Sequence, residues 1–124
     1  MTQEQIEGDV AIALFMGGKL KHYNISNEPY YQMPNKQQWM PERLIYHSDW
    51  NWLMEVVEKI ESMRCNEGNF EIFIFKRCCD IQTNKGTDHI IEITAATSKI
   101  EAVWIAITEF IQWHNSQVKS TPLK

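Results

Sequence analysis

Apolar side chains recur every three or four residues near the end of the chain, between residues 98 and 115. This spacing is typical of one face of an amphipathic helix. Ser98 and Glu101 add the S-x-x-E pattern with which many helices begin. The segment is therefore predicted to be a helix whose core-facing stripe contains Ile100, Val103, Trp104, Ile107, Phe110, Ile111 and His114.

The same periodicity predicts a helix over residues 49–64, with Ser48 or Asp49 as its N-cap. Its expected core stripe consists of Trp50, Leu53, Val57 and Ile60, widened by Trp52, Val56 and Met63. A further helix is predicted over residues 2–16, ended by the glycine pair at 17–18. Its apolar residues fall on two sides, which are Ile6, Val10, Ala13 and Leu14, and then Ile12, Phe15 and Met16.

Alternating and continuous apolar runs predict strands between these helices. Residues 70–75 (FEIFIF) are apolar on both faces, which favours an interior position in a sheet. Residues 78–82 and 88–94 are expected to pair with this strand, with a hairpin turn at 84–86. A short strand is possible at 19–25, whereas the proline-punctuated segment 26–43 is expected to be an irregular loop.

This order of elements predicts the α+β class. We expect a small antiparallel β-sheet of two to four strands packed with three helices, in the order α-(β)-loop-α-β-β-(β)-α, as an α-β-α sandwich-like fold. The chain of 124 residues fits one domain, expected over 1–115, followed by a polar C-terminal tail at 116–124.

Charge and composition exclude several classes of function. The formal net charge is −4 and the basic residues are scattered, so nucleic-acid binding is not expected. No apolar run reaches the roughly 20 residues of a membrane span, and the polar start is unlike a signal peptide. Three cysteines, two of them adjacent, are typical of a reducing compartment. A cytoplasmic location is therefore predicted, in the host cytoplasm if the protein is phage-encoded.

The sequence contains no recognisable catalytic or metal-binding motif. The four histidines and three cysteines form no zinc-ligand spacing, and Cys78 and Cys79 would point to opposite faces of a strand. No metal, no cofactor and no enzymatic activity are therefore expected. An enzyme would require His47 or His89 to meet Cys78, Cys79 or a carboxylate within a cleft.

Aromatic residues are concentrated between residues 30 and 52. Such side chains could attach the loop to the second helix, form a contact with a partner or a second subunit, or stack on a nucleotide base. In the last case Lys19, Lys21 or Arg43 would contact phosphate groups. The candidate binding residues are Tyr30, Tyr31, Trp39, Arg43, Tyr46 and Trp50.

Three segments carry a resemblance to a known family. These are the start, Met1-Thr2 with Gln5-Ile6-Glu7, the stretch from Tyr46-His47-Ser48-Asp49-Trp50 into residues 56–60 (VVEKI), and Glu101-Ala102-Val103 with Ala106. Together they resemble small phage and prophage proteins of the phage ABA sandwich domain type. The resemblance implies an α-β-α sandwich and a phage or mobile-element origin, and it assigns no activity to any residue.

The leading hypothesis is thus a non-catalytic protein-binding module that acts on a host or phage protein. The alternative is an anti-defence protein that binds and sequesters a nucleotide signal. A homodimer is expected because only one apolar side of the helix at 2–16 can face the sheet.

Overall fold

The computed structural model describes residues 2–65, 68–83 and 89–120. It contains three α-helices, α1 (Gln3–Phe15), α2 (Trp50–Ser62) and α3 (Lys99–Ser120), and a short 3-10 helix, η1 (Pro41–Arg43). The strands are β1 (Lys19–His22), β2 (Pro29–Gln32), β3 (Gln38–Trp39), β4 (Arg64–Cys65), β5 (Gly68–Phe75), β6 (Cys78–Thr83) and β7 (His89–Ile93). The α+β class with three helices is confirmed.

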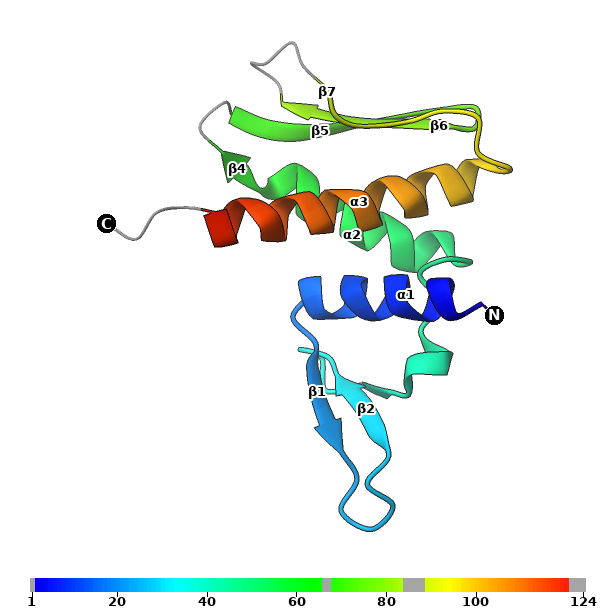
Figure 1. Ribbon diagram of the computed structural model, residues 1–124, viewed down its shortest axis with the longest axis vertical. Helices are drawn as coiled ribbons and strands as arrows, with labels where there is room; N and C mark the ends of the chain where they lie inside the picture. Colours follow the sequence, from blue (N-terminus) through cyan, green and yellow to red (C-terminus); the bar gives the residue numbers. More distant parts are fainter. Residues whose placement is uncertain (1, 66–67, 84–88, 121–124) are drawn as a thin grey trace.

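The strands form two antiparallel sheets, in the orders β1-β2-β3 and β4-β5-β6-β7. Figure 1 shows the layers: α2 and α3 lie against one side of the larger sheet, α1 lies beneath them, and the smaller sheet lies beyond α1. The three helices thus separate the two sheets. No described helix combines the length and the apolar character needed to cross a membrane.

The expectation of an irregular loop over 26–43 is wrong, because this segment contains β2, β3 and η1. Proline is compatible with this arrangement because Pro29 is the first residue of its strand and Pro41 is the first residue of η1. Tyr31 in β2 pairs with Leu20 of β1 on one side and with Trp39 of β3 on the other. The predicted strand at 19–25 is found, but it ends at His22.

Helix α1 begins where it was predicted, with a capping box between Thr2 and Gln5. Its predicted core stripe is wrong in part, since the buried residues are Asp9, Ile12 and Ala13, while Leu14 is 50% exposed. The apolar periodicity does not mark the core-facing side of α1, because a buried acidic residue, Asp9, lies at the centre of that side. The second apolar side packs within the chain, since Ile12 is fully buried and Phe15 and Met16 are partly buried against the core.

Gly8 has a packing role in the middle of α1. A Cβ atom built on Gly8 would lie 2.2 Å from Cζ2 of Trp104, so only glycine lets α3 approach this closely. Glycine weakens a helix by about 1 kcal/mol relative to alanine. This cost is offset by the placement of the Trp104 indole against α1.

Helix α2 begins after Asp49, whose Oδ1 accepts a hydrogen bond from the Trp52 backbone N–H at 3.1 Å. The buried residues Leu53, Val56, Val57 and Ile60 match the predicted stripe. Trp50, the first residue of α2, was predicted to belong to the core and is instead 40% exposed.

Helix α3 is capped as expected, with the Ser98 hydroxyl accepting a bond from the Glu101 N–H at 3.2 Å. The Glu101 carboxylate accepts hydrogen bonds from the backbone N–H and the hydroxyl of Thr97. The capping pattern predicts the N–H of the next residue, Ser98, as the donor. The helix continues to Ser120, so residues 116–120 are helical and only 121–124 of the predicted tail lie outside the described residues.

The larger sheet has one packed face and one open face. Phe70, Ile72 and Ile74 of β5 point toward the helices, and the interior position predicted for this strand is confirmed by its place between β4 and β6. Its other face is exposed, with Phe73 and Phe75 at 47% and 67%. The strands at 78–82 and 88–94 are found as β6 and β7, and the turn predicted at 84–86 lies outside the described residues.

Candidate functional site

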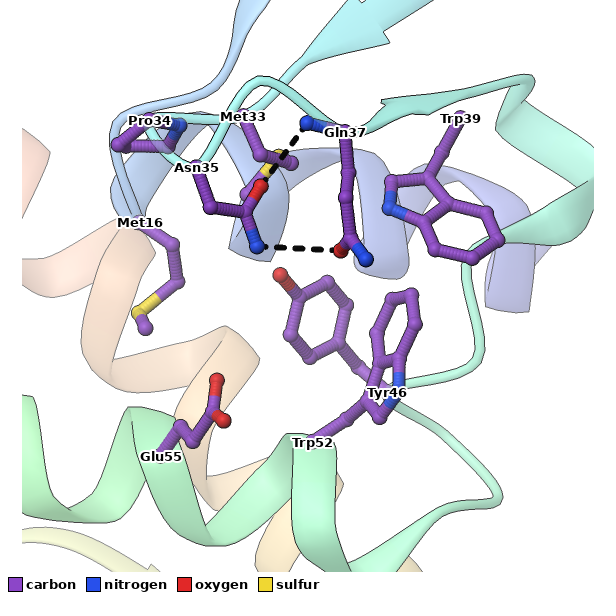
Figure 2. A pocket seen from close by; sticks show the side chains of 9 residues that line it. All are labelled: Met16, Met33, Pro34, Asn35, Gln37, Trp39, Tyr46, Trp52 and Glu55. Atoms are coloured by element: carbon purple, nitrogen blue, oxygen red, sulfur yellow. Dashed lines mark hydrogen bonds between the residues drawn. The ribbon is translucent and has the colours of Figure 1, made fainter.

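A cavity of about 490 Å³ opens between the smaller sheet and α2. We call it the aromatic pocket (Figure 2), and its lining consists of Met16, Met33, Pro34, Asn35, Gln37, Trp39, Tyr46, Trp52 and Glu55. Its volume lies in the range of about 300–1,000 Å³ that is usual for ligand sites. The pocket thus brings together residues that are distant in the sequence, from the end of α1 to the middle of α2.

Three aromatic rings form one wall of the aromatic pocket. The Trp52 ring lies 5.1 Å from the Trp39 ring and 5.1 Å from the Tyr46 ring between centroids, with edge-to-face angles of 68° and 72°. Such pairs contribute about 0.5–1.5 kcal/mol beyond their buried area. These ring contacts attach β3, and the segment that precedes α2, to α2 itself. Three parts of the chain therefore hold the wall in place.

The turn between β2 and β3 forms the opposite rim and is stiffened by its own hydrogen bonds. The Asn35 side chain accepts a bond from the Gln37 N–H at 3.0 Å and donates one to the Gln37 side-chain oxygen at 3.1 Å. Lys36 adopts a positive φ of 72°, which closes the turn. Figure 2 shows both amide side chains facing the cavity above the Tyr46 hydroxyl.

The polar groups of the pocket favour a positively charged ligand. Burial and the nearby Glu55 and Asp9 carboxylates raise the pKa of Tyr46 to about 12, so its hydroxyl stays neutral. The oxygen of this hydroxyl can accept a hydrogen bond from a cationic group. Glu55 is exposed and supplies a negative charge at the base of the view in Figure 2. No lysine or arginine is among the described residues that line this cavity.

The six residues predicted as a binding site do not all lie together in the structure. Trp39 and Tyr46 line the aromatic pocket. Tyr31 is buried in the core, while Tyr30 stacks on Tyr23 with centroids 4.4 Å apart. The other two, Arg43 in η1 and Trp50 at the start of α2, are exposed and do not line the pocket.

The prediction did not include the other residues that line the aromatic pocket, which are Met16, Met33, Pro34, Asn35, Gln37, Trp52 and Glu55. Trp52 belongs to the same aromatic cluster in the sequence, so the sequence alone could have indicated it as a site residue. Glu55 lies on what the periodicity marks as the solvent side of α2, and nothing in its pattern distinguishes it from Glu58.

A second group of polar residues lies between α1 and α3, and we call it the Asp9 cluster (Asp9, His47 and Trp104). The Asp9 carboxylate is fully buried, accepts a hydrogen bond from Trp104 Nε1 at 2.8 Å, and contacts Nδ1 of His47. Burial raises the pKa of Asp9, and the bonds from Trp104 and His47 oppose that rise. His47 and Trp104 also line a second cavity of about 620 Å³.

The Asp9 cluster meets part of the requirement set for an enzyme, since His47 contacts a carboxylate beside a cavity. The two serine hydroxyls lining that cavity are engaged locally: Ser48 donates to the Ile45 carbonyl and Ser98 caps α3. Cys79 is buried, and burial raises its pKa to about 12, which leaves its thiol protonated and unreactive. The contacts of Asp9 with His47 and Trp104 therefore tie three segments of the chain together.

Comparisons with known proteins add no assignment. The chain matches no family model, no curated protein and no solved structure. A function for this chain is therefore inferred from the chemistry of the described residues.

Proposed function

We propose that this protein is a non-catalytic protein-binding module whose aromatic pocket accepts a cationic side chain, lysine or arginine, of its partner. The observation that carries the proposal is the combination of three aromatic rings with the Glu55 carboxylate in one cavity. Aromatic faces attract cations, by about 0.5–2 kcal/mol depending on exposure, and a carboxylate adds charge complementarity.

The composition of the lining supports a protein partner. Trp, Tyr and Met are enriched in the centres of protein interfaces, and methionine adapts its shape to a bound surface. The net charge of −4 also favours a basic partner. The identity of this partner as a host or phage protein, and the phage or mobile-element origin of the chain, rest on the resemblance described above.

Sequestration of a nucleotide signal is the alternative, and the pocket supports it less well. The rings could stack on a base, but a phosphate group would face Glu55 without a lysine or arginine in the lining. Lys19, Lys21 and Arg43, the expected phosphate ligands, do not line the cavity.

Titration with small cationic probes tests the proposal. N-acetyl-arginine methylamide should quench tryptophan fluorescence saturably, because the guanidinium contacts Trp39 and Trp52, whereas its neutral citrulline analogue should bind at least tenfold more weakly. Trp39→Ala and Glu55→Gln should each weaken binding of the arginine probe.

Matched controls separate the pocket from general effects. Trp50→Ala and Glu58→Gln change exposed residues of the same types on α2 and should leave probe affinity unchanged. Equal affinity for the charged and neutral probes, tighter binding of adenosine monophosphate, or equal losses in the control variants would each contradict the proposal.

We also propose that the protein forms a homodimer, with the region of α1 and β1 at the contact. Leu14 and Leu20, both 50% exposed, are the large apolar groups that remain uncovered there. Light scattering at micromolar concentration should give twice the 14.6 kDa mass of one chain, and Leu14→Glu should reduce it to one chain. A wild-type mass of 14.6 kDa would show that the protein is a monomer.

A further inference from the structure

An irregularity in the larger sheet brings three possible metal ligands to its open face. Asp80 of β6 pairs directly with Glu92 of β7, so their side chains share a face. His89 lies three residues before Glu92, and in a regular strand these two side chains would point to opposite faces. The pairing shifts between Ile81 and Gln82, so that Ile91 pairs with Ile81 but His89 pairs with Gln82.

The shift makes Ile90 the additional residue of a β-bulge and turns His89 to the side of Asp80 and Glu92. Bulges commonly redirect a side chain in this way. One ligand atom from each of the three residues lies within 4.8 Å of the others. The Nδ1 atom of His89 is 3.7 Å from Oδ2 of Asp80, too far for a hydrogen bond between these two atoms.

We propose that Asp80, His89 and Glu92 form a binding site for a divalent transition-metal cation of the Zn²⁺ class. An imidazole nitrogen selects such ions over Mg²⁺ and Ca²⁺, which prefer oxygen ligands alone. Two carboxylates neutralise the charge of the ion, and water completes the coordination, as at zinc sites with three protein ligands.

The separations of the three donors suit this assignment. Zinc bonds to nitrogen and oxygen of about 2.0–2.2 Å place neighbouring donors about 3–4 Å apart. The distance of 3.7 Å between His89 and Asp80 already lies in this range. The side chains of Asp80 and His89 are 32% and 45% exposed, so rotation about their side-chain bonds can bring the remaining donor into place. This site is separate from the aromatic pocket, and neither proposal depends on the other.

Isothermal titration of the reduced, full-length chain with Zn²⁺ tests the site. We expect saturable binding of one ion per chain, weakened at least tenfold by His89→Ala and by Glu92→Gln. Both residues are exposed, so circular dichroism should confirm that the two variants remain folded. His22→Ala changes an exposed histidine in the other sheet and should leave the affinity unchanged.

Co²⁺ identifies the ligands independently, because cobalt bound to thiolate has an intense near-ultraviolet charge-transfer band that nitrogen and oxygen ligands do not produce. A complex without this band, lost in His89→Ala, is the expected result. Absence of saturable Zn²⁺ binding, an unchanged affinity in His89→Ala, or a thiolate band showing that the ion is bound by the cysteines would overturn the proposal.

Discussion

Replacing Asp9 by alanine is expected to lower the free energy of unfolding by about 3–5 kcal/mol, the cost of removing one partner from a buried polar pair. The substitution leaves the N–H groups of Trp104 and His47 without their acceptor in a buried site. Since domains of this size are stable by about 5–15 kcal/mol, the loss is a large share of the total. Urea denaturation followed by circular dichroism measures it.

Asp9→Asn is the control, because asparagine keeps the shape and can still accept a bond from Trp104. We expect it to cost much less than Asp9→Ala, and equal losses in the two variants would contradict a role for the acceptor. The pH dependence supplies a second check. Because burial raises the pKa of Asp9 above its ordinary 3.8, its contribution to stability is full below pH 3.8 and declines as the pH rises through the folded-state pKa. The asparagine variant should lack this decline.

The Asp9 cluster also positions the aromatic pocket. His47 follows Tyr46 directly, so the contact between His47 and Asp9 fixes the segment that carries the Tyr46 ring into the wall of the pocket. Trp104 approaches through the space left by Gly8 and completes the same arrangement from α3. The stability of the core and the shape of the proposed binding site are therefore coupled through three residues.

Local patterns predicted most of the elements. Helices α1 and α2 lie within the segments expected at 2–16 and 49–64, and α3 extends beyond the expected 98–115 to Ser120. The prediction that the second helix reaches residue 64 is wrong, because Arg64 is the first residue of β4. The periodicity of α2 and α3 is set by the face that each packs against the core. The strands β5, β6 and β7 were predicted from apolar runs separated by turns. The pattern does not predict strands β2 and β3, because they are short and because proline, present near their ends as Pro29 and Pro34, favours a loop.

The polar groups were harder to predict because their partners are distant in the sequence. Asp9 meets residues 38 and 95 positions away, so neither its burial nor its bonds follow from the pattern of α1. The grouping of His89 with Asp80 and Glu92 depends on a bulge that no residue type marks. Trp39 and Tyr46 could be chosen as site residues because aromatic clustering is visible locally, whereas Glu55 is distinguished only by its position in space.

Phe110→Ala is expected to lower the free energy of unfolding by about 3–5 kcal/mol, as for other large-to-small changes of buried aromatic residues. Phe110 is fully buried, and its ring lies 5.0 Å from Phe70, 5.7 Å from Trp113 and 6.4 Å from Phe15 between centroids. These contacts join α3 to β5 and to α1, so the cavity left by the substitution would loosen the attachment of the helices to the larger sheet.

Phe75→Ala makes the same chemical change on the open face of that sheet. Phe75 is 67% exposed and its ring contacts Lys76, whose Nζ lies 5.5 Å from the ring centroid. Truncation there should change the free energy of unfolding by no more than about 0.5 kcal/mol, as is usual for surface positions. Denaturation of both variants under the same conditions compares the two faces of the sheet directly. Equal losses would mean that the face of β5 carrying Phe75 is packed in solution, which would require a second chain or another covering on the side away from α2 and α3.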